Sequence, residues 1–184
     1  MKIKRTILYS LLFLIAAVQC LFIGGIIYEQ QQHFYALPFI FLFIFLLASY
    51  FHTFIKEFHI QYDSWKSGIW IFVGTILVWA LRSQWDIDPV LATAITGTSA
   101  ALLPMIFKRS KYIKQIPAPV YCGAFISMST IQTNLYFLLL AAAISFFVYL
   151  GAKTIMNGIG GKLGTLAFLG VVFAYLLYNL FTWI

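Results

Sequence analysis

The stretch Ile7–Tyr28, ILYSLLFLIAAVQCLFIGGIIY, runs for 22 residues without a charge and follows a basic start, Met1–Arg5. An α-helix rises about 1.5 Å per residue, so about 20 apolar residues cross a hydrocarbon core about 30 Å thick. The apolar core of a signal peptide is shorter, about 7–15 residues. Although Ala16–Cys20 faintly resembles a lipoprotein cleavage box, we expect this segment to be a retained transmembrane helix.

The whole chain has the composition of a membrane protein. Its 184 residues are 62% hydrophobic and only 9% charged, and its mean hydropathy is +0.93. Soluble domains are about 45–50% apolar and about 25% charged. The net charge of +7 does not indicate a nucleic-acid partner, because the basic residues lie between apolar runs rather than on one face of a soluble domain.

Six more apolar runs follow the first. The sequence therefore predicts an all-α integral membrane protein, a single transmembrane domain of about seven helices. The predicted spans are residues 7–28, 34–55, 65–85, 89–107, 116–130, 135–152 and 163–184. In the third span we expect Lys66 and Arg82 to snorkel, with Trp65 and Trp85 at the level of the lipid headgroups.

The distribution of basic residues predicts the orientation. With a cytoplasmic N-terminus and seven crossings, only Arg82 lies on the outer side. The cytoplasmic side receives Lys2, Lys4, Arg5, Lys56, Lys66, Lys108, Arg109, Lys111, Lys114, Lys153 and Lys162. This asymmetry follows the positive-inside rule. The fifth run is short and contains Pro117 and Pro119, but a re-entrant loop there would reduce the ratio from eleven to one to nine to three. We therefore expect an outer C-terminus and a bacterial cytoplasmic (inner) membrane.

Small and hydroxyl residues gather in three later segments of the chain. They are Thr93, Thr96, Gly97, Thr98 and Ser99; Gly123, Ser127, Ser129 and Thr130; and Gly158, Gly160, Gly161, Gly164 and Thr165. Such residues allow tight helix packing, and in transporters they also mark interrupted helices that bind solutes or ions. Our hypothesis is a shared substrate path near the bilayer middle, lined by Thr96, Gly97, Thr98, Ser99, Ser127, Ser129 and Thr130.

Two charged groups have candidate binding roles. On the outer side, Arg82, Asp86 and Asp88 form a candidate mouth that selects what enters; alternatively, Arg82 and Asp86 form an i,i+4 ion pair that fixes the loop. On the cytoplasmic side, we expect the basic cluster to bind anionic lipid headgroups. That cluster consists of Lys108, Arg109, Lys111 and Lys114.

No residue pattern predicts catalysis, a cofactor or a metal. No charged residue lies in the middle of a span, so a buried carboxylate relay is missing. His52, Lys56, His59 and Asp63 would share one helical face, but Lys56 would repel a cation. Cys20 and Cys122 lie inside apolar runs and are expected to be buried packing residues.

The predicted function is a small transporter or channel, or the membrane-embedded substrate-binding subunit of one, with a path lined by hydroxyls and backbone carbonyls. The alternative is a non-transporting subunit, scaffold or signalling partner of a larger complex. A third possibility is a lipid-modifying enzyme, although no catalytic residue is assigned. The expected partners are membrane lipids and either a partner protein or further copies of the chain.

Overall fold

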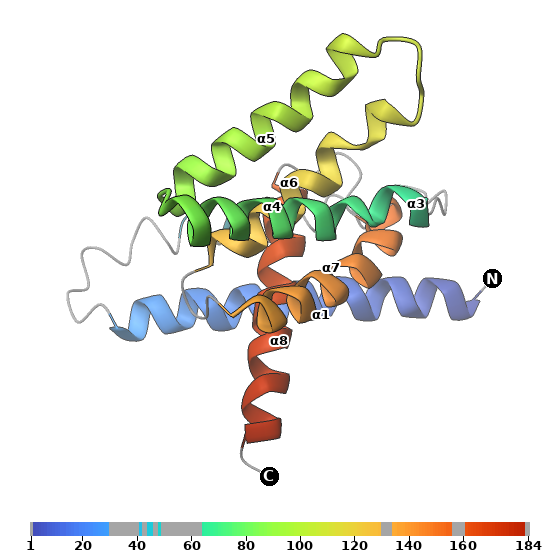
Figure 1. Cartoon of the computed structure of the whole chain (residues 1–184). Coiled ribbons are helices and arrows are strands. Elements are labelled where there is room, and N and C mark those ends of the chain that lie inside the picture. The colour runs from blue at the N-terminus through green and yellow to red at the C-terminus, as the bar shows by residue number, and fades with distance from the viewer. Residues whose placement is uncertain are drawn as a thin grey trace. The chain divides into compact units, whose positions relative to one another are not determined.

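A computed structural model describes residues 2–29, 41, 44, 45, 48, 64–129, 134–155 and 161–182. All the regular structure in these ranges is helical, which confirms the all-α prediction (Figure 1). The chain divides into two compact units, residues 1–60 and 61–184. Each unit is described by itself.

The first unit contains α1, which runs from Lys2 to Glu29 and so includes the predicted span 7–28. At 28 residues the helix is about 42 Å long. Most of the predicted span 34–55 lies outside the described residues, as does the face formed by His52, Lys56, His59 and Asp63. Cys20 is exposed on α1, so the expectation that it is buried was wrong, whereas Cys122 is buried as predicted.

The second unit begins with α3 (Trp65–Gly68) and α4 (Trp70–Trp85), two helices where one was predicted over 65–85. Then come α5 (Pro89–Ile106), a 3-10 turn η1 (Ile113–Gln115) and α6 (Pro117–Met128). The last two helices are α7 (Leu135–Ile155) and α8 (Lys162–Thr182). These boundaries match the predicted runs to within a few residues, including the short fifth run, where α6 has 12 residues.

Helices α4, α5 and α6 form a packed group in which α4 and α6 run in the same direction. Buried side chains join them in two layers. One layer consists of Val78, Ala92 and Ala124, and the other of Ala100, Ile116 and Val120. Trp70 of α4 packs against the second layer. From the first layer to the second the residue numbers rise along α5 and fall along α4 and α6, so α5 is antiparallel to both. This order of directions is the one that the predicted spans three to five require.

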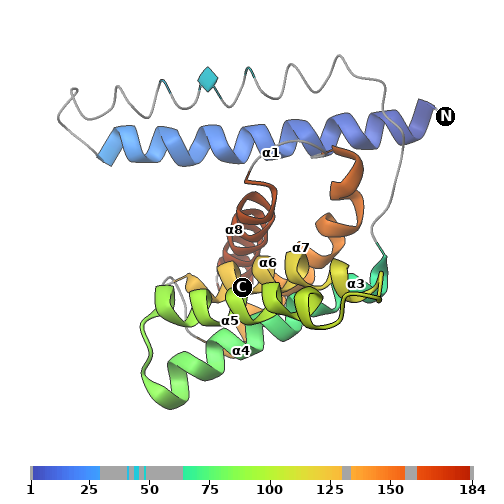
Figure 2. The same cartoon turned by 90° about the horizontal axis from the view of Figure 1, so that it is seen from above.

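Helices α7 and α8 form an antiparallel pair. The hydroxyl of Ser145 donates to the carbonyl of Leu166 at 3.0 Å, and the Phe137 and Tyr178 rings are 6.2 Å apart. At Gly170 the helices are so close that a Cβ would overlap Ser145. In both views α8 crosses α4 instead of running alongside it (Figures 1 and 2). The helices of the second unit therefore do not share one axis, as a simple bundle would require.

Two of the described helices are long and apolar enough to cross a membrane by themselves. They are Pro89–Ile106, which is all of α5, and Lys162–Leu180 in α8. The apolar parts of α1 and α7, Phe13–Gly25 and Leu135–Gly151, are shorter than the 18 residues taken as the minimum for a membrane span. The structure thus confirms helices but does not confirm seven membrane spans.

Candidate functional site

The contact between α4 and α6 depends on two glycines, one on each helix. A Cβ atom at Gly123 would overlap the carbonyl oxygen of Ile71, and one at Gly74 would overlap that of Val120. The hydroxyl of Thr75 donates to the Ile71 carbonyl at 2.9 Å and lies 3.2 Å from the carbonyl of Gly123. The backbones therefore touch directly, as small residues permit in membrane helix pairs.

Arg82, near the end of α4, caps the C-terminus of α6. Its Nη1 donates to the carbonyl of Ser127 and, at 3.3 Å, to that of Ser129. The last carbonyls of a helix have no partner within the helix, and they carry its negative dipole end. A guanidinium donates hydrogen bonds to these carbonyls and carries a positive charge that offsets the dipole. The short α6 can therefore end beside Arg82. Arg82 was predicted to snorkel; it bonds a neighbouring helix instead.

The turn between α4 and α5 is fixed by two aspartates. Asp86 follows the last residue of α4 in the left-handed conformation, with φ 49° and ψ 33°, a region that Asp tolerates better than most residues. Asp88 caps α5, because its Oδ1 accepts from the backbone N–H groups of Val90 (2.8 Å) and Leu91 (3.4 Å). Pro89 occupies the first helical position, which needs no N–H donor.

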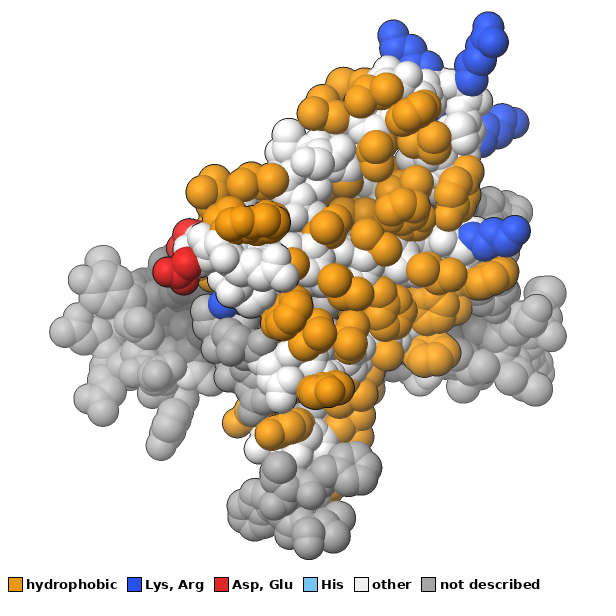
Figure 3. Space-filling view, viewed as in Figure 1, with side chains coloured by type: hydrophobic (Ala, Val, Ile, Leu, Met, Phe, Trp, Pro, Cys, Tyr) orange, Lys and Arg blue, Asp and Glu red, His pale blue; other side chains and the backbone are white. Residues whose placement is uncertain are grey.

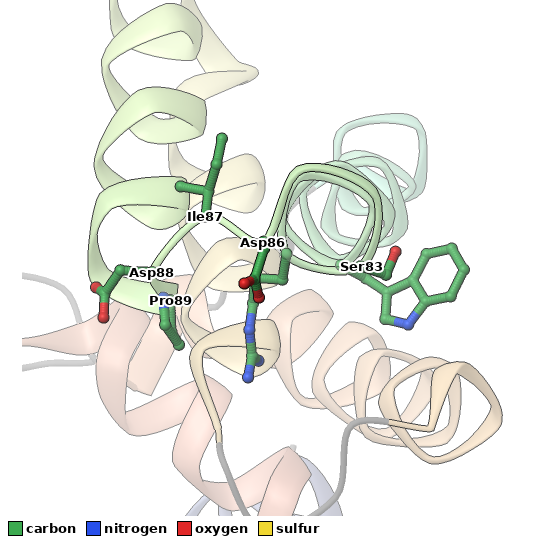
Figure 4. Close-up of a pocket in the computed structure, with 7 residues that line it drawn as sticks. Ser83, Asp86, Ile87, Asp88 and Pro89 are labelled. Atoms are coloured by element: carbon green, nitrogen blue, oxygen red, sulfur yellow. The ribbon is translucent and has the colours of Figure 1, made fainter.

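A pocket of about 550 Å³ opens beside this turn. We call it the turn pocket. It is lined by Trp79, Arg82, Ser83, Asp86, Ile87, Asp88 and Pro89. In Figure 4 the carboxylates of Asp86 and Asp88 hang from the same side of the loop, with Pro89 between them, while Ile87 points to the other side. Ile87 packs against Val78, Ala92 and Ala124, which anchors the turn.

The turn pocket contains all three residues of the predicted outer mouth. The predicted i,i+4 ion pair is not formed: α4 ends at Trp85, and within the described residues Arg82 instead bonds α6. Trp79 and Ser83 were not predicted to belong to this site. Arg82 and Ser83 follow Trp79 by three and four residues, which places all three near one helical face, so this spacing was a usable signal.

The residues of the predicted substrate path differ in burial in the described structure. Thr96 and Gly97 are buried, with the Tyr121 ring against Gly97, whereas Thr98 and Ser99 are exposed. Ser127 is fully buried and donates to the carbonyl of Thr75 at 2.7 Å. Thr130 lies outside the described residues.

The sequence did not predict the surroundings of two residues in this region, Thr96 and Ser129. The Thr96 hydroxyl is buried and has no hydrogen-bond partner among the described residues. Ser129 lines a second pocket, of about 330 Å³, together with Gly164 and apolar side chains of α6 and α8. This pocket joins two of the three segments rich in small residues, but it is largely apolar, with side chains such as Phe125 and Val171 in its wall.

Most basic side chains of the second unit lie at a different end from its acidic ones. Figure 3 shows basic side chains gathered toward the α5–α6 loop and acidic ones at the α4–α5 turn, where Arg82 of α4 also lies. Lys108, Arg109, Lys111 and Lys114 are all exposed. Tyr112 ties their loop to α3 and α4, because its hydroxyl accepts from Trp70 Nε1 at 3.0 Å and donates to the carbonyl of Lys66 at 3.2 Å.

No group of three or more His, Cys, Asp or Glu in the described ranges is arranged to hold a metal ion. The turn pocket is lined by charged side chains of both signs. Comparison with protein-family models, with curated proteins and with solved structures gives no match for this chain.

Proposed function

We propose that the chain is an integral membrane protein whose turn pocket binds a small polar solute, acting as the membrane-embedded substrate-binding subunit of a transport system. The observation that carries this proposal is that Arg82, Asp86 and Asp88 line one pocket of about 550 Å³. Sites for small molecules usually have volumes of about 300–1,000 Å³ and a few well-placed polar groups. The turn pocket has both properties.

The exposed surface of the second unit supports a location in a membrane. Large apolar side chains cover much of the face in Figure 3, and Met105 and Phe147 are 66% and 71% exposed. Soluble monomers rarely expose contiguous apolar patches larger than a few hundred Å². We propose about seven spans with a cytoplasmic N-terminus, in a bacterial cytoplasmic (inner) membrane.

The directions of the helices support the proposed orientation. Because α4 and α6 are parallel and α5 is antiparallel, the basic α5–α6 loop lies at the opposite end from Arg82, Asp86 and Asp88. The positive-inside rule then places the loop in the cytoplasm and the turn pocket at the outer face. The same loop, with Lys108, Arg109, Lys111 and Lys114, is proposed to bind anionic lipid headgroups at about 1 kcal/mol per basic residue.

The contacts of the hydroxyl groups favour a binding subunit over an independent channel. Thr75 and Ser127 hydrogen bond across the α4–α6 contact, and the Thr93 hydroxyl lies 3.4 Å from the carbonyl of Ala124 on α6. Since these groups join helices, they support packing and leave the passage of solute to a partner or to further copies.

A second candidate function is a non-transporting subunit that packs against another membrane protein through α5. Thr98 and Ser99 are exposed near the middle of that helix. Ser99 donates to the carbonyl of Ile95 at 2.7 Å, whereas the Thr98 hydroxyl has no partner in the described residues. Polar groups in hydrocarbon favour contact with another helix, so a Thr98→Cys variant should cross-link to a neighbouring chain if this candidate is correct.

Site-specific labelling tests the binding proposal. In a Cys20→Ser background, Ser83→Cys places a thiol in the wall of the pocket, and Gln84→Cys places one beside it but outside the lining. A bound solute should slow maleimide labelling at position 83 and leave position 84 unchanged. If no anion, cation or zwitterion at millimolar concentration protects position 83, the turn pocket is not a solute site.

A further inference from the structure

We propose that the turn pocket is selective for a zwitterion: a small group that carries an anionic oxygen group and a primary ammonium a few bonds apart. This inference rests on the proposed function and adds the chemical class of the ligand. It follows from the donors of Arg82 and the acceptors of Asp86 that make no other hydrogen bond among the described residues, and from the charge of the residues around them.

Arg82 lines the pocket and has donors that its bonds to α6 do not use. Both of its hydrogen bonds to α6 come from Nη1, and a guanidinium also carries N–H groups on Nη2 and Nε. Within the described residues these remaining donors have no partner. An Nη2–Nε edge matches two oxygens of a carboxylate or phosphate. The bonds to α6 hold the guanidinium in place, so an anion would meet a pre-oriented group.

Asp86 supplies the complementary acceptor. Its backbone is held at the end of α4, where its N–H bonds the carbonyl of Leu81, and its carboxylate has no partner among the described residues. Arg82 and Asp86 line the same pocket without forming an ion pair there. A ligand with charges of both signs would satisfy both groups at once, because its anion would bind Arg82 and its ammonium would bind Asp86.

The remaining lining residues favour an ammonium over a second anion. Asp88 adds a carboxylate to the wall, although its Oδ1 is already used in capping α5. Counting Asp86, Asp88 and Arg82, the lining carries one net negative charge. The half-buried Trp79 contributes an indole ring, a surface that attracts cations at roughly 0.5–1 kcal/mol or more.

The source of this zwitterion is either a lipid or a dissolved solute. Trp85 lies one residue from Asp86 and is 64% exposed, as expected of an interfacial anchor at headgroup level. A phosphoethanolamine headgroup and a free amino acid share the required chemistry. The experiment separates the two sources.

Protection of the Ser83→Cys thiol against maleimide measures the affinity. The protein is placed in phosphatidylcholine nanodiscs and titrated with glycine and with phosphoethanolamine; acetate, inorganic phosphate and ethanolamine supply the single charges. We expect a zwitterion to protect at a concentration about ten-fold lower than any of the three probes that carry charge of one sign only, since a hydrogen bond to a charged group contributes about 1.5–3 kcal/mol. Protection of the thiol in phosphatidylethanolamine nanodiscs without added solute would identify the lipid headgroup as the source.

Two aspartate variants make the same change in charge and test the assignment. Asp86→Asn keeps a residue that tolerates the left-handed conformation, and it should weaken zwitterion binding about ten-fold, to the level of the anion alone. Asp88→Asn keeps a side chain that caps helices and should weaken binding less. Equal losses in the two variants, or no loss in Asp86→Asn, would overturn the inference.

The outcomes distinguish this inference from the proposed function. If single ions protect as well as zwitterions, the pocket binds solutes but the zwitterion class is wrong. If no probe and no lipid protects position 83, the proposed function itself fails. A melting curve for each variant checks that a loss of protection does not come from unfolding.

Discussion

The guanidinium of Arg82 donates to the backbone carbonyl of Ser127, 45 residues further along the chain. This bond links the end of α4 to the end of α6, two helices that run in the same direction. It also places a basic residue at the acidic end of the second unit, where it caps the last turn of the short helix α6. In the proposed membrane location little water reaches these carbonyls, so such a cap would stabilise more than on a wet surface.

Replacing Arg82 should therefore destabilise the second unit. Arg82→Gln removes the charge and most donors, and we expect a loss of about 1–3 kcal/mol in the free energy of unfolding. Arg82→Lys keeps the charge but loses the planar fork, so its loss should be smaller. Unfolding of the purified protein by denaturing detergent measures both.

Lys111→Gln is the matched control for the Arg82 variants, because it also removes one positive charge but acts on an exposed side chain of the basic loop. Its free energy of unfolding should change by less than about 0.5 kcal/mol. Equal effects at positions 82 and 111 would show that net charge, and not the cap on α6, accounts for the loss.

Glycine substitutions test the close approach of α4 and α6. In Gly123→Ala the added Cβ would overlap the Ile71 carbonyl and lie 2.8 Å from the Thr75 backbone nitrogen. Backbone atoms move less easily than a flexible side chain, so we expect a loss of about 1–3 kcal/mol. Gly151→Ala in α7 has no neighbour within 4 Å and should be neutral or stabilising by up to about 1 kcal/mol. If both variants melt at the same temperature, the close contact is not present in the protein.

Helices whose ends carry recognisable residue types were predicted well from the sequence. Contacts between helices were predicted poorly. Asp88 followed by Pro89 is a helix start that can be recognised from residue types alone, and α5 begins there. The role of Arg82 could not be predicted in this way, because it depends on a parallel neighbour 45 residues away that ends early. The sequence showed that the fifth apolar run is short, but it did not show that Arg82 caps the end of the short helix α6.

The residues of the predicted hydroxyl path on α5 do not share one face, for a reason that the sequence did contain. Thr96 and Thr98 are two residues apart, and on an α-helix such residues do not face the same side. The structure buries the first and exposes the second. Grouping hydroxyl residues by their place in the chain, without the helical period, combined two faces of α5 into one predicted site.

Hydroxyl deletions should separate helix contacts from a solute path. Ser127→Ala removes the donor to the Thr75 carbonyl and should cost about 0.6 kcal/mol, at most about 1.7, the range measured for such bonds in membrane helices. Thr96→Val removes a buried hydroxyl that has no partner among the described residues, and it should be neutral or stabilising. If Thr96→Val instead impairs solute protection of position 83 while the protein stays folded, a path through α5 regains support.

Labelling in intact cells tests the proposed orientation through residues at opposite ends of the second unit. In a Cys20→Ser background, Gln84→Cys lies at the α4–α5 turn and Lys111→Cys in the basic loop, and both side chains are exposed. Because α5 lies between these two positions and has 18 residues, about 27 Å of helix separates its ends. With the turn outside, an impermeant maleimide should label position 84 and should reach position 111 only after the cells are permeabilised. The buried Cys122 should not react in either case, and the Cys20→Ser parent measures its background.

Labelling of position 111 in intact cells, with position 84 protected until permeabilisation, would reverse the orientation and place the turn pocket in the cytoplasm. Labelling of both positions in intact cells would mean that α5 does not cross the membrane, and the seven-span proposal would then be wrong.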